Sequence, residues 1–344
     1  MKIIYDDIIY SLQCSGGVSL YWSQLEKHLR YDMQLLYNDY VENIFWQESE
    51  ASQKIKKNVY MPFERYKNIH LVEKKPFVFH SSYYRYCTNK NSVNITTVHD
   101  FVYEKFRHDI KSIVHKIQKK NAVYNSQGVI FVSENTKNDF ESIYPDYKGK
   151  KRVIHHGLGV EYKNMTLPKK NTVVFIGGRT KYKNFVYALK LMQKMEQFEF
   201  QIIGGGFLNK KEIGYLNEYI PNRYEYYHSP TNEELNLIYN EAFFLLYPSL
   251  YEGFGFPVLE AQAAGCPVVC CHVSSLPEVA GDAAIYITGC NIDDDLEKIL
   301  QLNNRKTYNK IIKKGLENCR KFTWEKCAEN TYKFYEEVYD LHKR

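Results

Sequence analysis

The chain lacks the features that mark a membrane-spanning or an exported protein. Its 344 residues contain no run of about 18 apolar side chains, which is the length that a membrane-spanning helix requires. The first residues, MKIIYDDIIYSLQCSGG, carry acidic side chains where a signal peptide has its apolar core. We therefore expect a cytoplasmic protein that is not exported.

Cysteine and histidine spacing gives no sign of a metal site or a disulfide framework. The 8 cysteines include no CxxC pair and no zinc-type Cys/His spacing. Cys270 and Cys271 are neighbours in the apolar run PVVCC, which predicts a buried strand, so free thiols in a reducing compartment are expected. His155 and His156 do not suggest a metal site either, because adjacent side chains on a strand point to opposite faces.

The chain also lacks a strong excess of charge. It has 46 basic and 40 acidic residues, for a net charge of +6. This balance weakly favours an anionic ligand or surface, and no RNP, KH or zinc motif is present, so we expect no nucleic-acid partner.

What the sequence does contain is an alternation of short apolar runs with amphipathic stretches. Runs such as FVFHSS and GVIFVS precede the polar interval EYKNMTLPKKNT, after which the alternation starts again. This pattern predicts βαβ units and parallel sheets. We predict two α/β domains, residues 1–165 and 166–323, and a last helix over 324–344. One face of that helix is expected to carry Trp324, Ala328, Tyr332 and Tyr335.

Residues 249–269, SLYEGFGFPVLEAQAAGCPVV, predict a loop that ends in a short helix. Pro257 suits the first helical position and Gly265 suits the end of the helix. Gly253 and Gly255 allow backbone amides to approach a ligand, and the helix dipole adds attraction for a phosphate. The segment therefore predicts an anion site, with an ordinary loop–helix junction as the alternative.

Two glutamates, Glu252 in the loop and Glu260 in the first turn of the helix, lie on either side of this anion site. Carboxylates would repel a phosphate unless they also bind hydroxyls of the same ligand. A carboxylate matches a vicinal diol, as it does in dinucleotide-binding folds. We therefore expect Glu260 to bind a ribose and Glu252 a sugar, so the segment predicts a nucleotide-sugar site.

The segment SLYEGFGFPVLEAQAAGCPVVCCHVSSLPEVAG resembles the E-x7-E region of the family-4 retaining glycosyltransferases, of the group 1 type. VVFIGGRTKYKNF, FQIIGGG and SPTNEELNLIYNEAFFLLYPS resemble neighbouring segments of that family. SGGVSLYWSQL, TTVHDFVYEKF, SENTKNDF and VIHHGLG resemble segments of its first domain. The resemblance covers nearly the whole chain. It implies the α/β GT-B architecture, with two facing Rossmann-like domains and a C-terminal helix that crosses back onto the N-terminal domain.

The resemblance also implies site residues. Those that bind the donor would be Gly16, Gly17, Arg179, Lys183, Gly253, Phe254, Gly255 and Glu260. Those that act on the transferred sugar or the leaving diphosphate would be Glu252, His99, Lys183 and Arg179. Two cations stabilise a leaving diphosphate without a metal ion, so no metal or other cofactor is expected. The chain departs from the family at Gly178 and Leu20, which stand where members often have arginine.

Structural roles are the alternatives for some of these residues. Lys183 and Arg179 could be solvated surface residues, and His99 a strand-end histidine that is hydrogen-bonded within its own domain. We expect Asp100 to cap or orient a neighbour, and the DDD run at 293–295 to be a solvated loop or the start of a helix.

The stretch KSIVHKIQKKNAVY predicts a helix with an apolar stripe and a cationic face. The apolar stripe comprises Ile113, Val114 and Ile117, and the cationic face comprises Lys116, Lys119 and Lys120. Two interpretations stay open, an ordinary surface helix of the first domain or a peripheral contact with an anionic membrane.

Together, these features predict a retaining, metal-independent hexosyltransferase. It would move a hexose from a GDP- or UDP-linked donor, bound mainly on the C-terminal domain, to a hydroxyl of a glycan or lipid-linked glycan on the N-terminal domain. The resemblance implies bacterial surface polysaccharide as the product, either O-antigen or capsule. The alternatives are a sugar phosphorylase or a nucleotide-sugar epimerase of the same fold, or a non-catalytic nucleotide-sugar binder. A glycoside hydrolase also uses paired carboxylates, but it has no use for a phosphate site.

Overall fold

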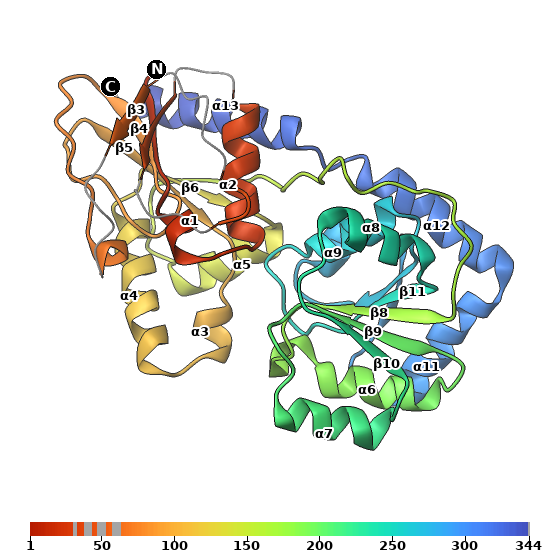
Figure 1. The fold of residues 1–344 in the computed structure, drawn as a ribbon. Coiled ribbons are helices and arrows are strands. Elements are labelled where there is room, and N and C mark those ends of the chain that lie inside the picture. The colour runs from red at the N-terminus through yellow and green to blue at the C-terminus, as the bar shows by residue number, and fades with distance from the viewer. Residues whose placement is uncertain (30–32, 38–42, 47–52, 57–62, 343–344) are drawn as a thin grey trace. The chain divides into compact units, whose positions relative to one another are not determined.

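The structure is a computed structural model, and it divides the chain into two compact units (Figure 1). The first consists of residues 1–157 with 324–344, and the second of residues 158–323. The residues that the structure describes are 1–29, 33–37, 43–46, 53–56 and 63–342.

Over the described residues, the first unit is built on a seven-stranded sheet, in which all strands are parallel and follow the order β3-β2-β1-β4-β5-β6-β7. The strands are β1 (Ile3–Asp6), β2 (Met33–Tyr37), β3 (Gln53–Lys56), β4 (Phe77–His80), β5 (Ser92–Val98), β6 (Gly128–Phe131) and β7 (Lys150–Val153). The helices are α1 (Ile8–Leu12), α2 (Gly17–His28), α3 (Val102–Phe106), α4 (Ile110–Tyr124), α5 (Glu134–Ile143) and α13 (Trp324–His342), with a 3-10 turn, η1 (Glu64–Tyr66).

The second unit has a six-stranded sheet, also parallel throughout, in the order β10-β9-β8-β11-β12-β13. The strands are β8 (Thr172–Ile176), β9 (Glu199–Ile203), β10 (Tyr224–Tyr227), β11 (Phe244–Tyr247), β12 (Val268–Cys271) and β13 (Ala284–Ile287). The helices are α6 (Phe185–Lys194), α7 (Lys210–Tyr219), α8 (Asn232–Glu241), α9 (Phe256–Ala263), α10 (Leu276–Ala280), α11 (Ile292–Leu300) and α12 (Arg305–Cys319), with 3-10 turns η2 (Lys181–Lys183) and η3 (Gln301–Asn303).

The central strands are buried along their whole length because both faces of each sheet are covered. Every residue of β4, β6, β11 and β12 is buried. This is the pattern of a parallel sheet with helices on its two faces. The prediction of a buried strand at Cys270 and Cys271 is confirmed, and both thiols are free.

The last helix belongs to the first unit, as predicted. The hydroxyl of Tyr335 lies 2.8 Å from that of Tyr5 and 2.5 Å from Nδ1 of His80. Tyr339 donates to the carbonyl of Pro76 at 3.1 Å, and Trp324 is buried. These bonds fasten α13 to β1 and β4, so the chain returns to its first domain after completing the second.

The boundary between the units lies after residue 157, whereas the sequence analysis placed it after residue 165. The segment that follows is fixed to the second unit through its backbone. The amides of Lys163 and Met165 donate to the side chains of Asn236 and Asn240 on α8, at 3.0 and 2.6 Å. These bonds between side chain and backbone leave no periodic signal in the sequence.

The acidic run at 293–295 begins α11, which agrees with the predicted helix start. However, Asp295 is fully buried instead of solvated. It accepts hydrogen bonds from the hydroxyl of Tyr187 at 2.6 Å and from the amides of Thr288 and Gly289 at 2.7 and 2.8 Å. These donors hold its pKa below the ordinary value, although burial alone would raise it. Asp295 is therefore a structural residue that ties α6 to α11.

Candidate active site

The residues around Glu252 form a loop that leads into α9, as predicted. α9 begins at Phe256, with Gly255 as its N-cap and Pro257 as its second residue. Gly255 has φ 108°, in the region that favours glycine. A Cβ atom there would also approach the side chain of Leu276 to 3.1 Å. The chain therefore requires glycine where it turns into the helix.

This loop and the one after β8 leave the second sheet at neighbouring positions. β8 and β11 are adjacent strands, and the strand order reverses between them. In open parallel sheets, ligands bind at the carboxyl ends of the strands, at the point where the order reverses. The fold therefore brings the segments that carry Lys183 and Glu252 to the position where a ligand is expected.

Lys183 and Glu252 are in direct contact. The Lys183 ammonium donates to Oε1 of Glu252 at 2.6 Å and to the hydroxyl of Tyr247 at 3.0 Å. The side chains of Lys183 and Glu252 are only 14% and 12% exposed. Burial alone would lower the pKa of Lys183, but the Glu252 carboxylate and Tyr247 raise it above the ordinary value. Lys183 is thus a charged residue held in place, and not a solvated surface lysine.

Two serines after β12 hold the backbone of the Glu252 loop. The amide of Glu252 donates to Oγ of Ser274 at 3.0 Å. The hydroxyl of Ser275, which is buried, donates to the carbonyls of Glu252 and Phe254 at 3.0 and 2.8 Å. These bonds give the loop a defined shape. No role was predicted for Ser274, Ser275 or Tyr247. The one signal in the sequence was position, since the serines follow β12 and Tyr247 is the last residue of β11.

The terminal guanidinium nitrogens of Arg179 donate to backbone carbonyls, whereas its buried Nε forms an ion pair but no hydrogen bond. Its Nη1 donates to the carbonyl of Gly204 and its Nη2 to that of Gly206, both at 2.6 Å. Its Nε lies 3.1 Å from a carboxylate oxygen of Glu212. Gly204, Gly205 and Gly206 all have φ between 71° and 77°, which turns the loop around the guanidinium. The structure therefore assigns Arg179 to holding this loop, a role that the sequence analysis did not give it.

Glu260 lies in the second turn of α9, and not in the first, because the helix begins at Phe256. Its carboxylate is 8% exposed and accepts a hydrogen bond from the hydroxyl of Tyr239 at 3.2 Å. Burial raises the pKa of Glu260 to about 7, and the nearby charge of Glu161 adds to the effect. The charged form of this buried carboxyl group destabilises the folded protein. A ligand that donates hydrogen bonds from hydroxyl groups would stabilise the charged form.

In the first unit, His99 lies at a cavity of about 270 Å³. Its ring packs edge-on against Tyr21 and stacks on His156, with centroid distances of 5.2 and 5.6 Å. Burial, together with the charge of Lys119, lowers the pKa of His99 to about 3. The imidazole is therefore neutral at physiological pH and can exchange hydrogen bonds with hydroxyl groups.

The neighbours of His99 have structural roles, in part as expected. Asp100 accepts a hydrogen bond from the amide of Val102 at 2.9 Å, which confirms its predicted capping role. Gly16 is the N-cap of α2, and Gly17 is the first residue of that helix. A Cβ atom on Gly16 would lie 2.8 Å from the side-chain oxygen of Gln13, which lines the cavity. A side chain at position 16 would therefore displace part of the cavity wall.

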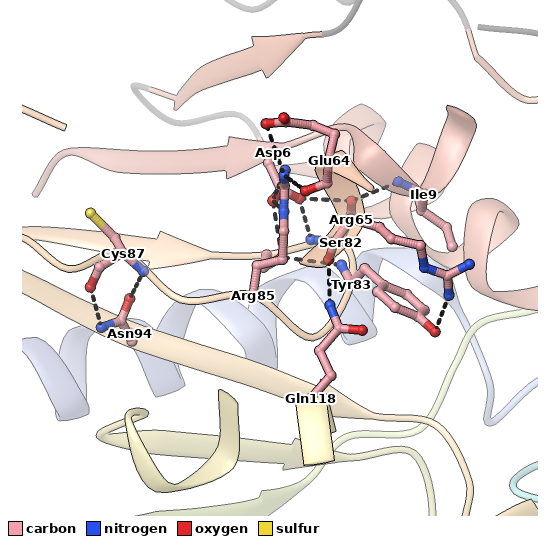
Figure 2. Close-up of polar contacts among 11 residues, drawn as sticks. Asp6, Ile9, Glu64, Arg65, Ser82, Tyr83, Arg85, Cys87, Asn94 and Gln118 are labelled. Carbon is pink, nitrogen blue, oxygen red and sulfur yellow. Dashed lines mark hydrogen bonds and ion pairs between the residues drawn. The ribbon is translucent and has the colours of Figure 1, made fainter. Parts of the chain in front are cut away.

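A buried ion pair fixes another part of the cavity wall (Figure 2). Arg85 donates to Oδ2 of Asp6 through Nε at 2.9 Å and through Nη2 at 2.6 Å. Asp6 also accepts from the amide and hydroxyl of Ser82, at 2.7 and 2.8 Å, and from the hydroxyl of Ser81 at 3.0 Å. Ser81 and Ser82 line the cavity, so this pair sets the direction of the loop after β4.

Comparison with known proteins identifies the second unit. Residues 162–318 match the family model for glycosyl transferases group 1, a range that spans almost all of residues 158–323. The second unit is a group 1 glycosyltransferase domain.

Relatives extend the similarity beyond that domain. The O-antigen chain mannosyltransferase B of Escherichia coli is 41% identical over 105 residues, which make up 30% of this chain and 28% of that protein. An uncharacterized glycosyltransferase of Methanocaldococcus jannaschii is 28% identical over 363 aligned positions, which cover 99% of both chains. The chain is therefore similar over its whole length to a glycosyltransferase, and over about a third of its length to an O-antigen mannosyltransferase.

A solved structure supports the fold of the whole chain. Sucrose-phosphate synthase from Thermosynechococcus elongatus has a TM-score of 0.75 and 17% identity, with 99% of both chains covered. This likeness, the two parallel sheets and the return of α13 to the first unit confirm the GT-B architecture predicted from the sequence.

The described residues include neither a metal-ligand cluster nor a membrane-spanning helix. Among them, no three histidine, cysteine or acidic side chains gather in a way that could hold a metal ion. In the same part of the chain, no helix combines the length and the apolar character needed to span a bilayer.

Proposed function

We propose that this group 1 glycosyltransferase is a retaining hexosyltransferase. It moves a hexose from a nucleoside diphosphate to a hydroxyl of a glycan acceptor. The observation that carries the proposal is the pair of Lys183 and Glu252, buried at the mouth of α9 where the strand order of the second sheet reverses. Retention of configuration rests on the resemblance of the E-x7-E region.

In the proposed reaction, the bond between the anomeric carbon and the diphosphate oxygen breaks while the acceptor oxygen attacks from the same face. Negative charge grows on the leaving diphosphate, and the Lys183 ammonium and the N-terminal end of α9 stabilise it. The leaving phosphate oxygen takes the proton of the acceptor hydroxyl, so no side chain has to act as the base. Gly253, Phe254 and Gly255 supply the backbone that approaches the phosphates.

The carboxylates bind the hydroxyl groups of the donor. Glu252 accepts hydrogen bonds from the hexose while its other oxygen stays near Lys183, and Glu260 accepts them from the ribose. Because Glu260 is buried beside Tyr239, a ribose diol would replace water as the donor to its charged form. Arg179 contributes by holding the loop after β9, and no metal ion takes part.

The first unit is the proposed acceptor domain. Neutral His99 exchanges hydrogen bonds with the transferred sugar, and Gly16 and Gly17 keep the start of α2 close to the ligands. The O-antigen mannosyltransferase relatives favour a mannosyl donor, with GDP as the leading nucleotide and UDP as the second. They also favour a role in bacterial surface polysaccharide, in O-antigen or capsule synthesis.

Donor turnover tests the proposal. The purified chain is incubated in EDTA with GDP-mannose, UDP-glucose and UDP-galactose, with and without a glycan acceptor, and nucleoside diphosphate release is measured. We expect release from one nucleotide class, faster with acceptor. Epimerised donor without an acceptor would favour an epimerase, and phosphate-dependent cleavage of a glycan would favour a phosphorylase. Donor binding without any turnover would favour a non-catalytic binder.

The surface of α4 supports a membrane contact for the acceptor domain. The sequence analysis expected Lys119 on the cationic face, but Lys119 is fully buried and donates to Glu104 at 2.9 Å. The apolar stripe is instead the exposed side. Ile110, Ile113 and Ile117 are 79%, 52% and 55% exposed. Lys119 is buried against Glu104, so the helix directs its apolar stripe to solvent, which is the opposite of what its amphipathic pattern predicts.

We propose that this apolar stripe enters the interface of an anionic membrane, where a lipid-linked glycan would lie. Exposed cations flank it on the same helix and the preceding turn, namely Arg107, Lys111 and Lys120. Apolar insertion combined with basic charge is the pattern of an interfacial helix. The location would then be the inner face of the membrane.

Vesicle sedimentation tests the membrane contact. Vesicles that contain phosphatidylglycerol should bind the chain more strongly than vesicles of phosphatidylcholine alone, and the double variant Ile113→Asp/Ile117→Asp should bind weakly. Ile213→Asp is the control, because Ile213 is 39% exposed on α7 of the other unit. Equal binding by the double variant and the control would contradict the contact.

A further inference from the structure

The cavity of the first unit contains hydrogen-bond donors that have no acceptor. Gln13, Trp22 and Arg65 all line it. Within the described residues, Nε2 of Gln13, Nε1 of Trp22 and Nε of Arg65 are buried and have no hydrogen-bond partner. A buried donor without a partner costs about 1–3 kcal/mol, and folded proteins keep few of them. Three around one cavity indicate a ligand that brings acceptor oxygens.

The charge of Arg65 is also uncompensated, unlike that of its neighbour Arg85. Arg85 is paired with Asp6 at 2.6 Å, whereas Arg65 has no ion pair with a described carboxylate. Figure 2 shows Arg65 bonded to the hydroxyl of Tyr83, to which its Nη2 donates at 2.5 Å. That hydroxyl lies 2.9 Å from Nδ1 of His115. A neutral phenol therefore orients the guanidinium without neutralising it.

None of the other titratable groups that line the cavity forms an ion pair with Arg65. His99 and His115 are both neutral, because burial and the charge of Lys119 lower the pKa of each to about 3. Asp100 is the acidic residue of the lining, and its carboxylate accepts a hydrogen bond from the amide of Val102 at 2.9 Å. Lys119 donates to the backbone carbonyl of Asp100, but its charge is paired with Glu104. Arg65 is the cation of the lining, and no described carboxylate lies within ion-pair distance of it, so its charge is available to a ligand.

We propose that the cavity binds an acceptor sugar through an anionic oxygen group, either the carboxylate of a uronic acid or a phosphate ester. Arg65 carries the charge recognition, and Gln13 and Trp22 add neutral donors. The cavity of about 270 Å³ is near the lower end of small-molecule pockets, roughly 300 Å³, which suits a single sugar residue. This inference rests on the proposed function, since it names the acceptor class of the same reaction.

Titration calorimetry with the full chain, saturated with the nucleoside diphosphate that it binds, tests the inference. The probes are methyl glucuronide, mannose 6-phosphate and methyl mannoside. We expect at least one anionic probe to bind about 10-fold more tightly than the neutral one, the range of a charge-assisted hydrogen bond. Whether the carboxylate or the phosphate probe prevails identifies the source of the anionic group.

Two variants and one control sharpen the test. Arg65→Gln should remove the roughly 10-fold preference while leaving the neutral probe within about 2-fold. Gln13→Glu keeps the length of its side chain but adds a repelling carboxylate, so it should also abolish the preference. Lys67→Gln is the control. Lys67 is an exposed neighbour that pairs with Glu64 at 3.3 Å, and its loss should change neither affinity.

Equal affinity for anionic and neutral probes, or no binding of any probe, would overturn the inference. So would a Lys67→Gln variant that loses the preference as fully as Arg65→Gln does, because the effect would then be general surface charge. Nucleoside diphosphate binding is measured in the same samples. If that binding persists without anion preference, only this inference fails. If it is absent, the proposed function fails.

Discussion

The candidate sites of the two units differ in how their cations are paired. In the second unit, Lys183 pairs with Glu252, and Arg179 pairs with Glu212 and bonds the carbonyls of its loop. In the first unit, the cavity keeps Arg65 and Trp22 with donors that no described residue accepts. The cations of the proposed donor site thus have protein carboxylates as partners, whereas Arg65 of the proposed acceptor cavity has none among the described residues.

This difference separates what is general to the family from what is particular to this chain. The family model covers residues 162–318, in the unit whose site is complete. If this site serves the proposed departure of a nucleoside diphosphate, one fixed arrangement of ion pairs is enough for that chemistry. The unpaired donors of the first unit suit a specific acceptor, because an acceptor that lacks their partners would leave them buried and unsatisfied.

The largest effect is expected for Glu252→Gln. The amide keeps the size of the side chain but loses the charge that holds Lys183 and binds the hexose, so transfer should fall about 100- to 1000-fold. Initial rates at saturating donor measure the effect. Glu196→Gln, at an exposed position of the same unit, is the matched control and should keep the full rate. A Glu252→Gln enzyme of normal rate would remove the main support for the donor site.

Lys183→Met should destabilise the second unit by about 3 kcal/mol, because it leaves the largely buried Glu252 carboxylate without its counter-charge. The double variant Lys183→Met/Glu252→Gln should recover most of that stability but none of the activity. Urea unfolding of the four proteins gives the coupling free energy. Additive effects on the free energy of unfolding would show that Lys183 and Glu252 are not coupled. The contrast with Arg65 of the first unit, which has no paired carboxylate, would then disappear.

Glu260→Gln should make the protein more stable at pH 8 by up to about 3 kcal/mol, while weakening nucleotide binding. The folded-state pKa of Glu260, about 7, lies above its ordinary value of 4.5. Stability therefore falls as pH rises between these values, and the loss is complete above pH 7.

The two proteins should be almost equally stable at pH 4.5. Thermal unfolding at both pH values measures the difference, with the exposed Glu218→Gln as the control. If the stability difference does not depend on pH, Glu260 is not a buried carboxyl group with a raised pKa.

Arg179→Lys should have the smallest effect, a few-fold rise in KM with kcat nearly unchanged. Lysine keeps the positive charge but cannot donate to the carbonyls of Gly204 and Gly206 at the same time, as the guanidinium does. The loop should therefore become less rigid. Steady-state kinetics with varied donor separates the two constants. A large fall in kcat would instead mean that Arg179 meets the diphosphate directly.

The sequence predicted the loop and helix of residues 249–269 well because this local structure depends on local rules. A glycine turn into a proline-started helix and two carboxylates in fixed positions can all be read from residues 249–269. The predicted helix start was one residue off, because the helix begins at Phe256 and not at Pro257, and this makes Glu260 the fifth helical residue.

The first unit was less predictable because its features depend on contacts between distant segments. The sequence pattern predicts Lys119 at the surface, but an ion pair with Glu104 on another helix compensates for its burial. With Lys119 inside, Ile113 and Ile117 lie on the exposed side of the helix. Arg65 carries no motif at all. It becomes a candidate only when the fold brings η1 beside Tyr83 and leaves its donor unpaired.

Calorimetric binding of GDP, UDP, dTDP and ADP in EDTA, to the wild-type chain and to Lys183→Met, tests the donor site most directly. The account predicts that one of the four binds the wild-type chain without added metal and that the variant binds it at least about 10-fold more weakly. Binding of none of the four, or equal binding by the variant, would contradict it.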